Sequence, residues 1–147
     1  PLDAMHDDLL PYRNLPLAGV MAAHVIYQCF DCNTAVFSNR WIDYLRNDIK
    51  FNGVVFTDDL SMAGAGVVGD MLARVQTAYA AGCDMLLVCN APDAVESVLT
   101  RWQAQIDPVR SARTEKLLPV EPSPSFAQLR ELPAYQAALK SLAMLAD

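Results

Sequence analysis

Two adjacent carboxylates, Asp58 and Asp59, end a short apolar run, Val54–Phe56. Nothing in that run alternates between apolar and polar residues, so it predicts a strand that is covered on both faces. Because carboxylates are costly to remove from water, we expect the pair at the rim of a sheet, open to water or to a ligand. In parallel α/β architectures this rim, the C-terminal edge of the strands, is where the chemistry lies.

Two further apolar runs also end in a polar residue. Leu17–Ala23 is followed by His24, and Asp84–Cys89 is followed by Asn90. About thirty residues separate His24 from Asp58 and Asp58 from Asn90, which is the length that a strand-helix-strand unit needs. The spacing therefore predicts three parallel strands in an open or closed sheet, with these polar side chains on one face of it.

The intervening segments have the periodicity and the caps of helices. The first predicted helix covers residues 3–14 and is broken by Pro11 and Pro16 before the first strand. The others cover residues 38–49 with Ser38 as the cap, residues 67–81 closed by Gly82, a segment that starts at Pro92, and the tail 126–145, broken near Pro133. Residues 25–37 predict a loop over the rim, and residues 107–124 an exposed connection.

Composition excludes several classes of protein. With 53% hydrophobic and only 19% charged residues among 147, the chain has the apolar content of a domain with a buried core. A net charge of −6 leaves no basic patch for nucleic acid or an anionic membrane. The sequence shows neither an apolar span nor a leader, so we expect a soluble protein that is not exported.

The cysteines do not form a convincing metal motif. Cys29 and Cys32 have the spacing of a zinc or redox pair, but Cys83 and Cys89 flank a predicted strand. A metal site formed by Asp58, Asp59 and His24 is a further alternative. We expect reduced cysteines of a cytoplasmic protein.

The central motif Gly53–Met62 reads GVVFTDDLSM, and related segments flank it at residues 8–13, 20–25 and 81–90. Together they resemble the nucleophile region of the family 3 glycoside hydrolases, and within them the bacterial β-N-acetylhexosaminidases of peptidoglycan recycling. The resemblance is close over residues 8–102 and weaker to Leu145. Ten contiguous residues with three flanking segments in the right order make it specific.

The resemblance implies a (β/α)8 TIM-type barrel, of which this chain would be the C-terminal part. Residues 1–106 would supply about three strand-helix units, strands six to eight, and five strands would precede residue 1. Residues 107–147 would form a linker and a helical tail that packs on the barrel. The family's acid/base, a His paired with an Asp, and its Lys-His and Arg sugar-gripping positions would also lie upstream, and we do not assign the acid/base role to His6.

By resemblance, Asp58 is the nucleophile, and its role requires an ionised carboxylate, which nearby amides would favour. Asp59 is expected to cap the turn or orient its neighbour. His24 would line the site, Met62 would close over the sugar, and the reaction would need no metal and no cofactor. The structural alternatives are a plain acid at a strand end for Asp58, a packed histidine for His24 and a core methionine for Met62.

The implied activity is that of a retaining β-N-acetylhexosaminidase that removes terminal β-linked N-acetylglucosamine from muropeptide-type substrates through a glycosyl-enzyme on Asp58. The chain alone is expected to be inactive, because it lacks the acid/base. One competing hypothesis is a non-catalytic α/β module that binds a small ligand at His24, Asp58 and Asn90. Another is a fragment that self-associates through an exposed sheet edge at Leu17–Ala23.

Overall fold

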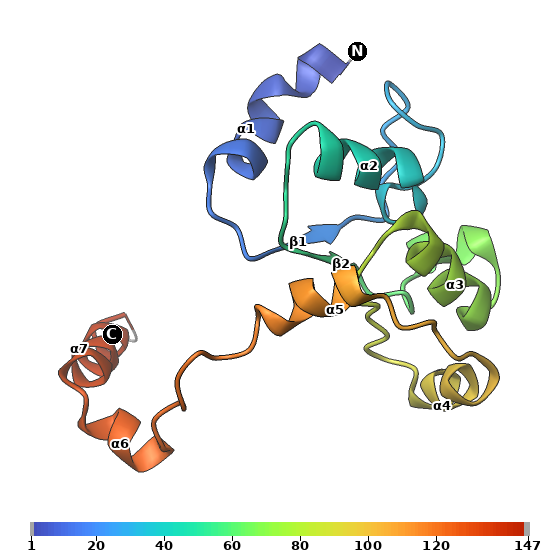
Figure 1. Cartoon of the computed structure of the whole chain (residues 1–147). Helices are drawn as coiled ribbons and strands as arrows, with labels where there is room; N and C mark the ends of the chain where they lie inside the picture. Colours follow the sequence, from blue (N-terminus) through green and yellow to red (C-terminus); the bar gives the residue numbers. More distant parts are fainter. Residues whose placement is uncertain (1, 146–147) are drawn as a thin grey trace. The chain divides into compact units, whose positions relative to one another are not determined.

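The computed structural model describes residues 2–145 and divides into two compact units, with the boundary after Leu117 (Figure 1). The first unit is a mixed α/β structure. Its elements are η1 (Leu2–Met5), α1 (His6–Asn14), β1 (Gly19–Ala22), η2 (Ala35–Phe37), α2 (Asn39–Asn47), β2 (Val54–Thr57), η3 (Ala63–Val68), α3 (Met71–Ala81), α4 (Pro92–Arg101) and α5 (Pro108–Glu115). The second unit contains α6 (Phe126–Glu131) and α7 (Pro133–Ala143).

The sheet is formed by β1 and β2, which pair in parallel with Gly19 opposite Val54 and Ala22 opposite Thr57. This confirms two of the three predicted strands. Gly53 is required where the strands meet, because a Cβ there would lie 2.5 Å from the carbonyl oxygen of Ala18. The pairing brings the C-terminal ends of both strands to the same edge of the sheet.

The third predicted strand, Asp84–Cys89, is not a regular strand, and that prediction was wrong. The segment runs beside β2 and makes one parallel bridge, between Phe56 and Met85. Backbone hydrogen bonds join it to β2, among them Thr57 to Met85 at 2.9 Å. Two side chains take the place of other ladder acceptors: the Asp84 carboxylate accepts the Val55 amide at 2.8 Å, and the Thr57 hydroxyl accepts the Leu87 amide at 2.8 Å. Polar side chains that compete for the backbone donors therefore make the segment irregular.

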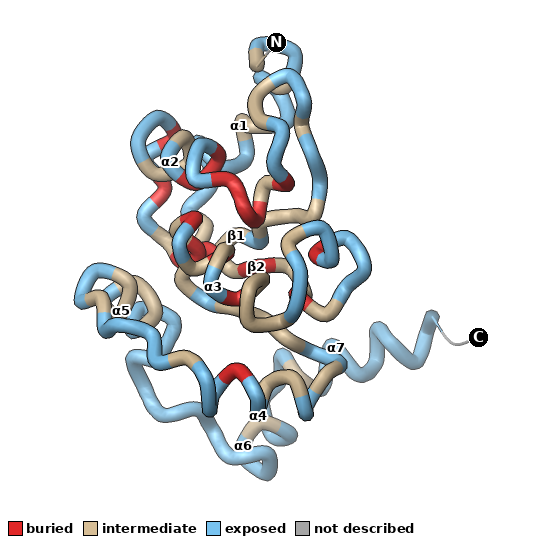
Figure 2. The backbone as a smooth tube through the Cα atoms, turned by 90° about the vertical axis from the view of Figure 1, so that its right-hand side faces the viewer, coloured by how far each residue is buried: buried red, intermediate tan, exposed pale blue. Residues whose placement is uncertain are grey.

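The core of the first unit lies between the sheet and the helices α2 and α3 (Figure 2). Val54 and Val55 of β2 are fully buried, as the unbroken apolar run predicted. Ser38 caps α2 by accepting the Trp41 amide at 3.0 Å, as expected. Gly82 closes α3 in the left-handed conformation with φ of 111°, which also confirms the sequence prediction.

Three predicted boundaries differ from the structure. Pro11 does not end the first helix but lies inside α1, which continues to Asn14. The predicted helix 67–81 is divided, because Val67 and Val68 belong to η3 and α3 begins only after Asp70, whose side chain caps it. The predicted exposed connection at 107–124 contains a regular helix, α5. The Asp107 side chain accepts two amides at its start and Pro108 takes the first helical position, where its missing N–H costs nothing.

The second unit is a pair of short helices separated at Pro133, as the sequence predicted. Ser125 and Gln128 form a reciprocal capping box at the start of α6. Among the described residues 2–145, no helix combines the length and the apolar character that crossing a membrane requires.

Candidate functional site

The ends of the two strands and of the irregular segment meet at one edge of the sheet. The Asp58 amide donates to the carbonyl of Ala22, at 3.1 Å, and thereby continues the contact between the strands. The Leu60 amide donates to the carbonyl of Leu87 at 2.8 Å on the other side. His24, Asp58 and Asn90 therefore lie on neighbouring chain segments, as the spacing predicted.

Asp58 follows β2 directly and is half-buried. One carboxylate oxygen, Oδ1, accepts a hydrogen bond of 2.8 Å from the backbone amide of Asp59. Within residues 2–145 the other oxygen, Oδ2, has no protein donor. One oxygen is thus fixed by the backbone while the other is available, an arrangement in which a carboxylate can attack an electrophile.

Asp59 accepts hydrogen bonds from three other residues. Its Oδ1 accepts the amides of Ser61, at 2.9 Å, and Cys89, at 3.0 Å. Its Oδ2 accepts the Ser61 hydroxyl at 2.6 Å and the Asn90 side-chain amide at 3.2 Å. These donors, the Ser61 hydroxyl first and the Cys89 amide next, lower the pKa of Asp59 to about 2. Asp59 is therefore ionised at neutral pH.

His24 joins the same group of residues through the backbone. Its Nε2 lies 3.0 Å from the carbonyl oxygen of Asp59, and because a carbonyl can only accept, the imidazole carries a proton on Nε2. The Nδ1 atom is buried without a hydrogen-bond partner among the described residues. The ring lies 5.9 Å from that of Phe37, and a Cβ at Gly64 would lie 3.0 Å from the His24 Cβ, so the imidazole is closely enclosed.

Met62 ends the turn that begins at Asp59 and lies just before η3. Its amide donates to the carbonyl of Asp59 at 3.1 Å, and its side chain is exposed. An exposed methionine beside the carboxylates is not a core residue here.

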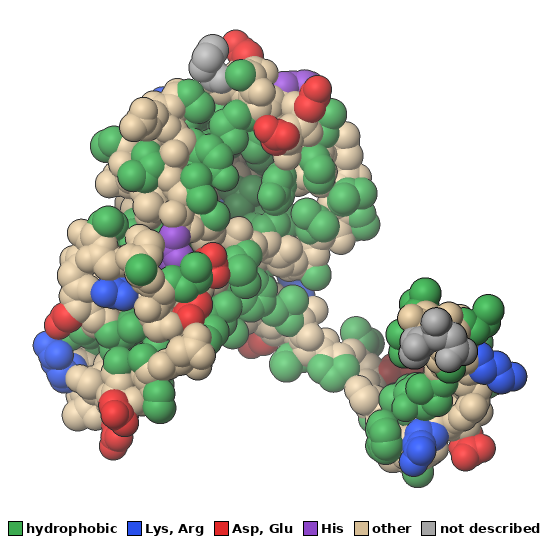
Figure 3. Space-filling view, turned by 180° about the vertical axis from the view of Figure 1, so that it is seen from behind, with side chains coloured by type: hydrophobic (Ala, Val, Ile, Leu, Met, Phe, Trp, Pro, Cys, Tyr) green, Lys and Arg blue, Asp and Glu red, His purple; other side chains and the backbone are tan. Residues whose placement is uncertain are grey.

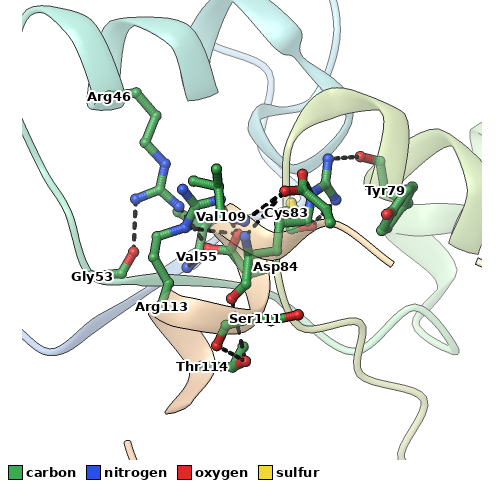
Figure 4. A network of polar contacts seen from close by, with 12 residues as sticks. Arg46, Gly53, Val55, Tyr79, Cys83, Asp84, Val109, Ser111, Arg113 and Thr114 are labelled. Carbon is green, nitrogen blue, oxygen red and sulfur yellow. Dashed lines mark hydrogen bonds and ion pairs between the residues drawn. The ribbon is translucent and has the colours of Figure 1, made fainter. Parts of the chain in front are cut away.

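A buried ion-pair network that the sequence reasoning missed lies near the start of β2, at the opposite end of the strand from the carboxylates (Figure 4). The Asp84 side chain has no exposed surface and lies 2.6 Å from both Arg46 and Arg113. Arg46 also donates to the carbonyls of Phe51 and Gly53, just before β2. The network fixes the start of β2 and the start of the 84–90 segment together. The available signal was an acid at the head of an apolar run, where a charge needs a buried partner.

A cavity of about 200 Å³ lies elsewhere, between α1, β1 and α2. Hydrophobic side chains gather around a hollow on one face of the molecule (Figure 3). The cavity lining includes Leu9, Val20, Trp41 and Leu45, and none of Asp58, Asp59 or His24. The cavity is therefore separate from the carboxylates.

The fold and these residues define the class of the protein. Residues 3–115 match the N-terminal domain of the glycosyl hydrolase family 3, and the chain belongs to this family. Among curated relatives, the β-hexosaminidase of Aromatoleum aromaticum is 52% identical over 115 residues, which are 76% of this chain and 32% of that protein. The β-hexosaminidase of Nitrosomonas eutropha is 39% identical over 97% of this chain and 42% of its own length.

Solved structures give the same assignment. A crystal structure of NagZ from Neisseria gonorrhoeae in complex with N-trifluoroacetyl-D-glucosamine matches with a TM-score of 0.82 and 33% identity, over 99% of this chain and 43% of that one. The β-N-acetylglucosaminidase of Thermotoga maritima matches with a TM-score of 0.59 and 30% identity, over 68% of this chain and 24% of that one. The chain thus spans less than half the length of each of these proteins.

Proposed function

We propose that this chain is the nucleophile-bearing part of a retaining β-N-acetylhexosaminidase. Its membership of family 3 and the β-hexosaminidase relatives support a glycoside hydrolase. The observation that carries the proposal is the arrangement of Asp58 at the end of β2, with Oδ1 held by the Asp59 amide and Oδ2 without a protein donor among the described residues. In a retaining glycosidase this oxygen attacks the anomeric carbon and forms a covalent glycosyl-enzyme, which water then hydrolyses.

The substrate we propose is a terminal β-linked N-acetylglucosamine on a muropeptide-type molecule. The resemblance of residues 53–62 to the hexosaminidases of peptidoglycan recycling supports this choice. The glucosamine derivative bound to the N. gonorrhoeae structure is consistent with the same sugar class. In this proposal His24 lines the sugar site and Met62 covers the sugar. The enzyme would act in the cytoplasm, where its four free cysteines would stay reduced.

The complete site requires residues beyond this chain in our proposal. Family 3 enzymes of this kind are expected to use an Asp-x-His element as acid/base, and no such element occurs in these 147 residues. We propose that β1, β2 and the 84–90 segment correspond to strands six to eight of a (β/α)8 barrel. In residues 2–145, β1 pairs on one side only, and its Met21 side chain is exposed, which supports a sheet that continues past β1.

The chain by itself is proposed to be inactive, because a general acid/base contributes about 10²- to 10⁴-fold to the rate.

The unpaired edge of β1 favours an alternative, in which two copies of the chain associate through this edge. Sedimentation velocity distinguishes an inactive monomer from a self-associating chain. A monomer at micromolar concentration excludes self-association, and a dimer that dissociates on Met21→Lys substitution would support it.

Hydrolysis of a chromogenic β-N-acetylglucosaminide tests the proposed function. A version of the chain extended upstream by the missing barrel strands should release the chromophore, and proton NMR should show the β-anomer of the sugar first. Asp58→Ala should abolish turnover, whereas Asp93→Asn, the same type of charge loss at an exposed position, should not. Initial formation of the α-anomer, or full activity of Asp58→Ala, would contradict the proposal.

A further inference from the structure

We infer that Asp59 is a positioning residue for the attack by Asp58, and this inference rests on the function proposed above. The two acids are adjacent, and each could serve as a nucleophile by residue type alone. Their hydrogen bonds separate them. Asp58 has one bonded carboxylate oxygen, whereas both oxygens of Asp59 are occupied by protein donors.

The occupancy of Asp59 leaves no room for a reaction at its carboxylate. An ionised carboxylate offers about four acceptor sites, and the donors from Ser61, Cys89 and Asn90 fill four. To attack a sugar or to take a proton, Asp59 would first have to give up one of these hydrogen bonds. Its chemistry is therefore structural: it binds the turn after β2 to the end of the 84–90 segment.

The backbone of Asp59 transmits this constraint to Asp58. The Asp59 carbonyl accepts hydrogen bonds from His24 Nε2 at 3.0 Å and from the Met62 amide at 3.1 Å. The Asp59 amide donates to Asp58 Oδ1 at 2.8 Å. The amide and the carbonyl of Asp59 are thus both hydrogen-bonded, so the amide that donates to the Asp58 carboxylate is held in one orientation. Asp59 links three chain segments: His24 after β1, its own position after β2, and Cys89 with Asn90 at the end of the irregular segment.

Loss of the Asp59 carboxylate should release this arrangement. The Ser61 and Cys89 amides would lose their acceptor, and only the bonds of His24 and Met62 to the Asp59 carbonyl would still hold this peptide in place. A displacement of the reacting group by about 1 Å can cost about 10²-fold in rate without a change in substrate contacts. A positioning role therefore lowers the rate of bond formation and leaves sugar binding almost unaffected.

The test measures how fast a 5-fluoro N-acetylglucosamine-type trapping reagent forms a covalent adduct on the upstream-extended chain. Asp59→Ala should lower the maximal rate of adduct formation about 10²-fold, with the half-saturating reagent concentration within about twofold of wild type. Asp59→Asn should lose less, because its Oδ1 still accepts both amides while the Ser61 hydroxyl and the Asn90 amide reorient. Asp93→Asn, an exposed acid outside this group, should react like the wild type.

The outcomes separate this inference from the function on which it rests. If the wild type forms no adduct, or forms it at a residue other than Asp58, the proposed function is overturned and the role of Asp59 falls with it. If the wild type is labelled at Asp58 and Asp59→Ala reacts at the same maximal rate, only the positioning role is overturned. An effect confined to the half-saturating concentration would also overturn it. If Asp59→Ala does not fold by circular dichroism, the near-isosteric Asp59→Asn decides, and a wild-type maximal rate in that variant contradicts the inference.

Discussion

Replacing Asp84 by alanine should lower the free energy of unfolding of the first unit more than the loss of any exposed charge would. The carboxylate is fully buried and accepts hydrogen bonds from Arg46 at 2.6 Å, from Arg113 at 2.6 and 3.0 Å, and from the Val55 amide at 2.8 Å. The variant would leave two guanidinium groups, only 16% and 14% exposed, without their counter-charge. The Val55 amide would also be buried without an acceptor.

Removing one partner of a buried ion pair typically costs about 3–5 kcal/mol, because the remaining charge stays desolvated. An exposed pair gives the contrast. Arg101 and Asp70 are 3.9 Å apart and 55% and 65% exposed. Water screens such a pair, so Arg101→Ala should change the free energy of unfolding by less than about 1 kcal/mol.

Urea unfolding of the 147-residue chain, followed by circular dichroism, measures both variants. With a slope of about 2 kcal/mol per molar urea, Asp84→Ala should lower the midpoint by roughly 2 M, and Arg101→Ala by less than about 0.5 M. If Asp84→Ala is unfolded without urea, Asp84→Asn, which retains an acceptor for Val55, gives a measurable intermediate loss. Equal midpoints for Asp84→Ala and Arg101→Ala would refute the reasoning.

Three further predictions concern single residues. Because the pKa of Asp59 is lowered to about 2, its contribution to stability is present above its unfolded pKa of 3.8 and is lost as the pH falls toward 2. The difference in urea midpoint between wild type and Asp59→Asn should therefore shrink from pH 6 to pH 2, and a constant difference would contradict it. Burial raises the pKa of the Cys83 thiol to about 12. Iodoacetamide at pH 8 should therefore label the three exposed cysteines of the folded chain and modify Cys83 only after urea is added. Labelling of all four cysteines at once would refute this. Gly82→Ala should lower the free energy of unfolding, measured with urea, by about 1–3 kcal/mol, because φ is 111° and the new Cβ would lie 2.8 Å from Ile42 Cγ2. An unchanged urea midpoint would show that α3 ends differently.

Much of the fold was predictable from local patterns. The apolar run at Val54–Phe56 predicted β2, and the cap at Ser38 and the glycine at Gly82 marked helix ends where the structure has them. Such signals are contained within a few neighbouring residues. The 84–89 segment could not be predicted in the same way, because its irregularity comes from Asp84 and Thr57 accepting backbone donors across segments.

The site was predictable to the level of which strand ends meet. The spacing of His24, Asp58 and Asn90 placed them on one edge, and the hydrogen bonds of Asp59 to Asn90 and His24 bear this out. Different roles were expected for Asp58 and Asp59, but the particular bonds were not predictable, because Cys89 and Asn90 lie about thirty residues from Asp59 in the chain. The arrangement of donors adds that both oxygens of Asp59 are occupied, whereas one oxygen of Asp58 has no protein donor among the described residues.

The most direct test of the central claim is the mass of the protein after trapping. The chain and its upstream-extended version are incubated with the 5-fluoro N-acetylglucosamine-type reagent, and intact mass and peptide mapping locate any adduct. The account predicts one sugar on Asp58 of the extended version, none on Asp58→Ala, and none or little on the 147-residue chain. A sugar on Asp59, or an equal adduct on Asp58→Ala, would contradict the assignment of Asp58 as the nucleophile.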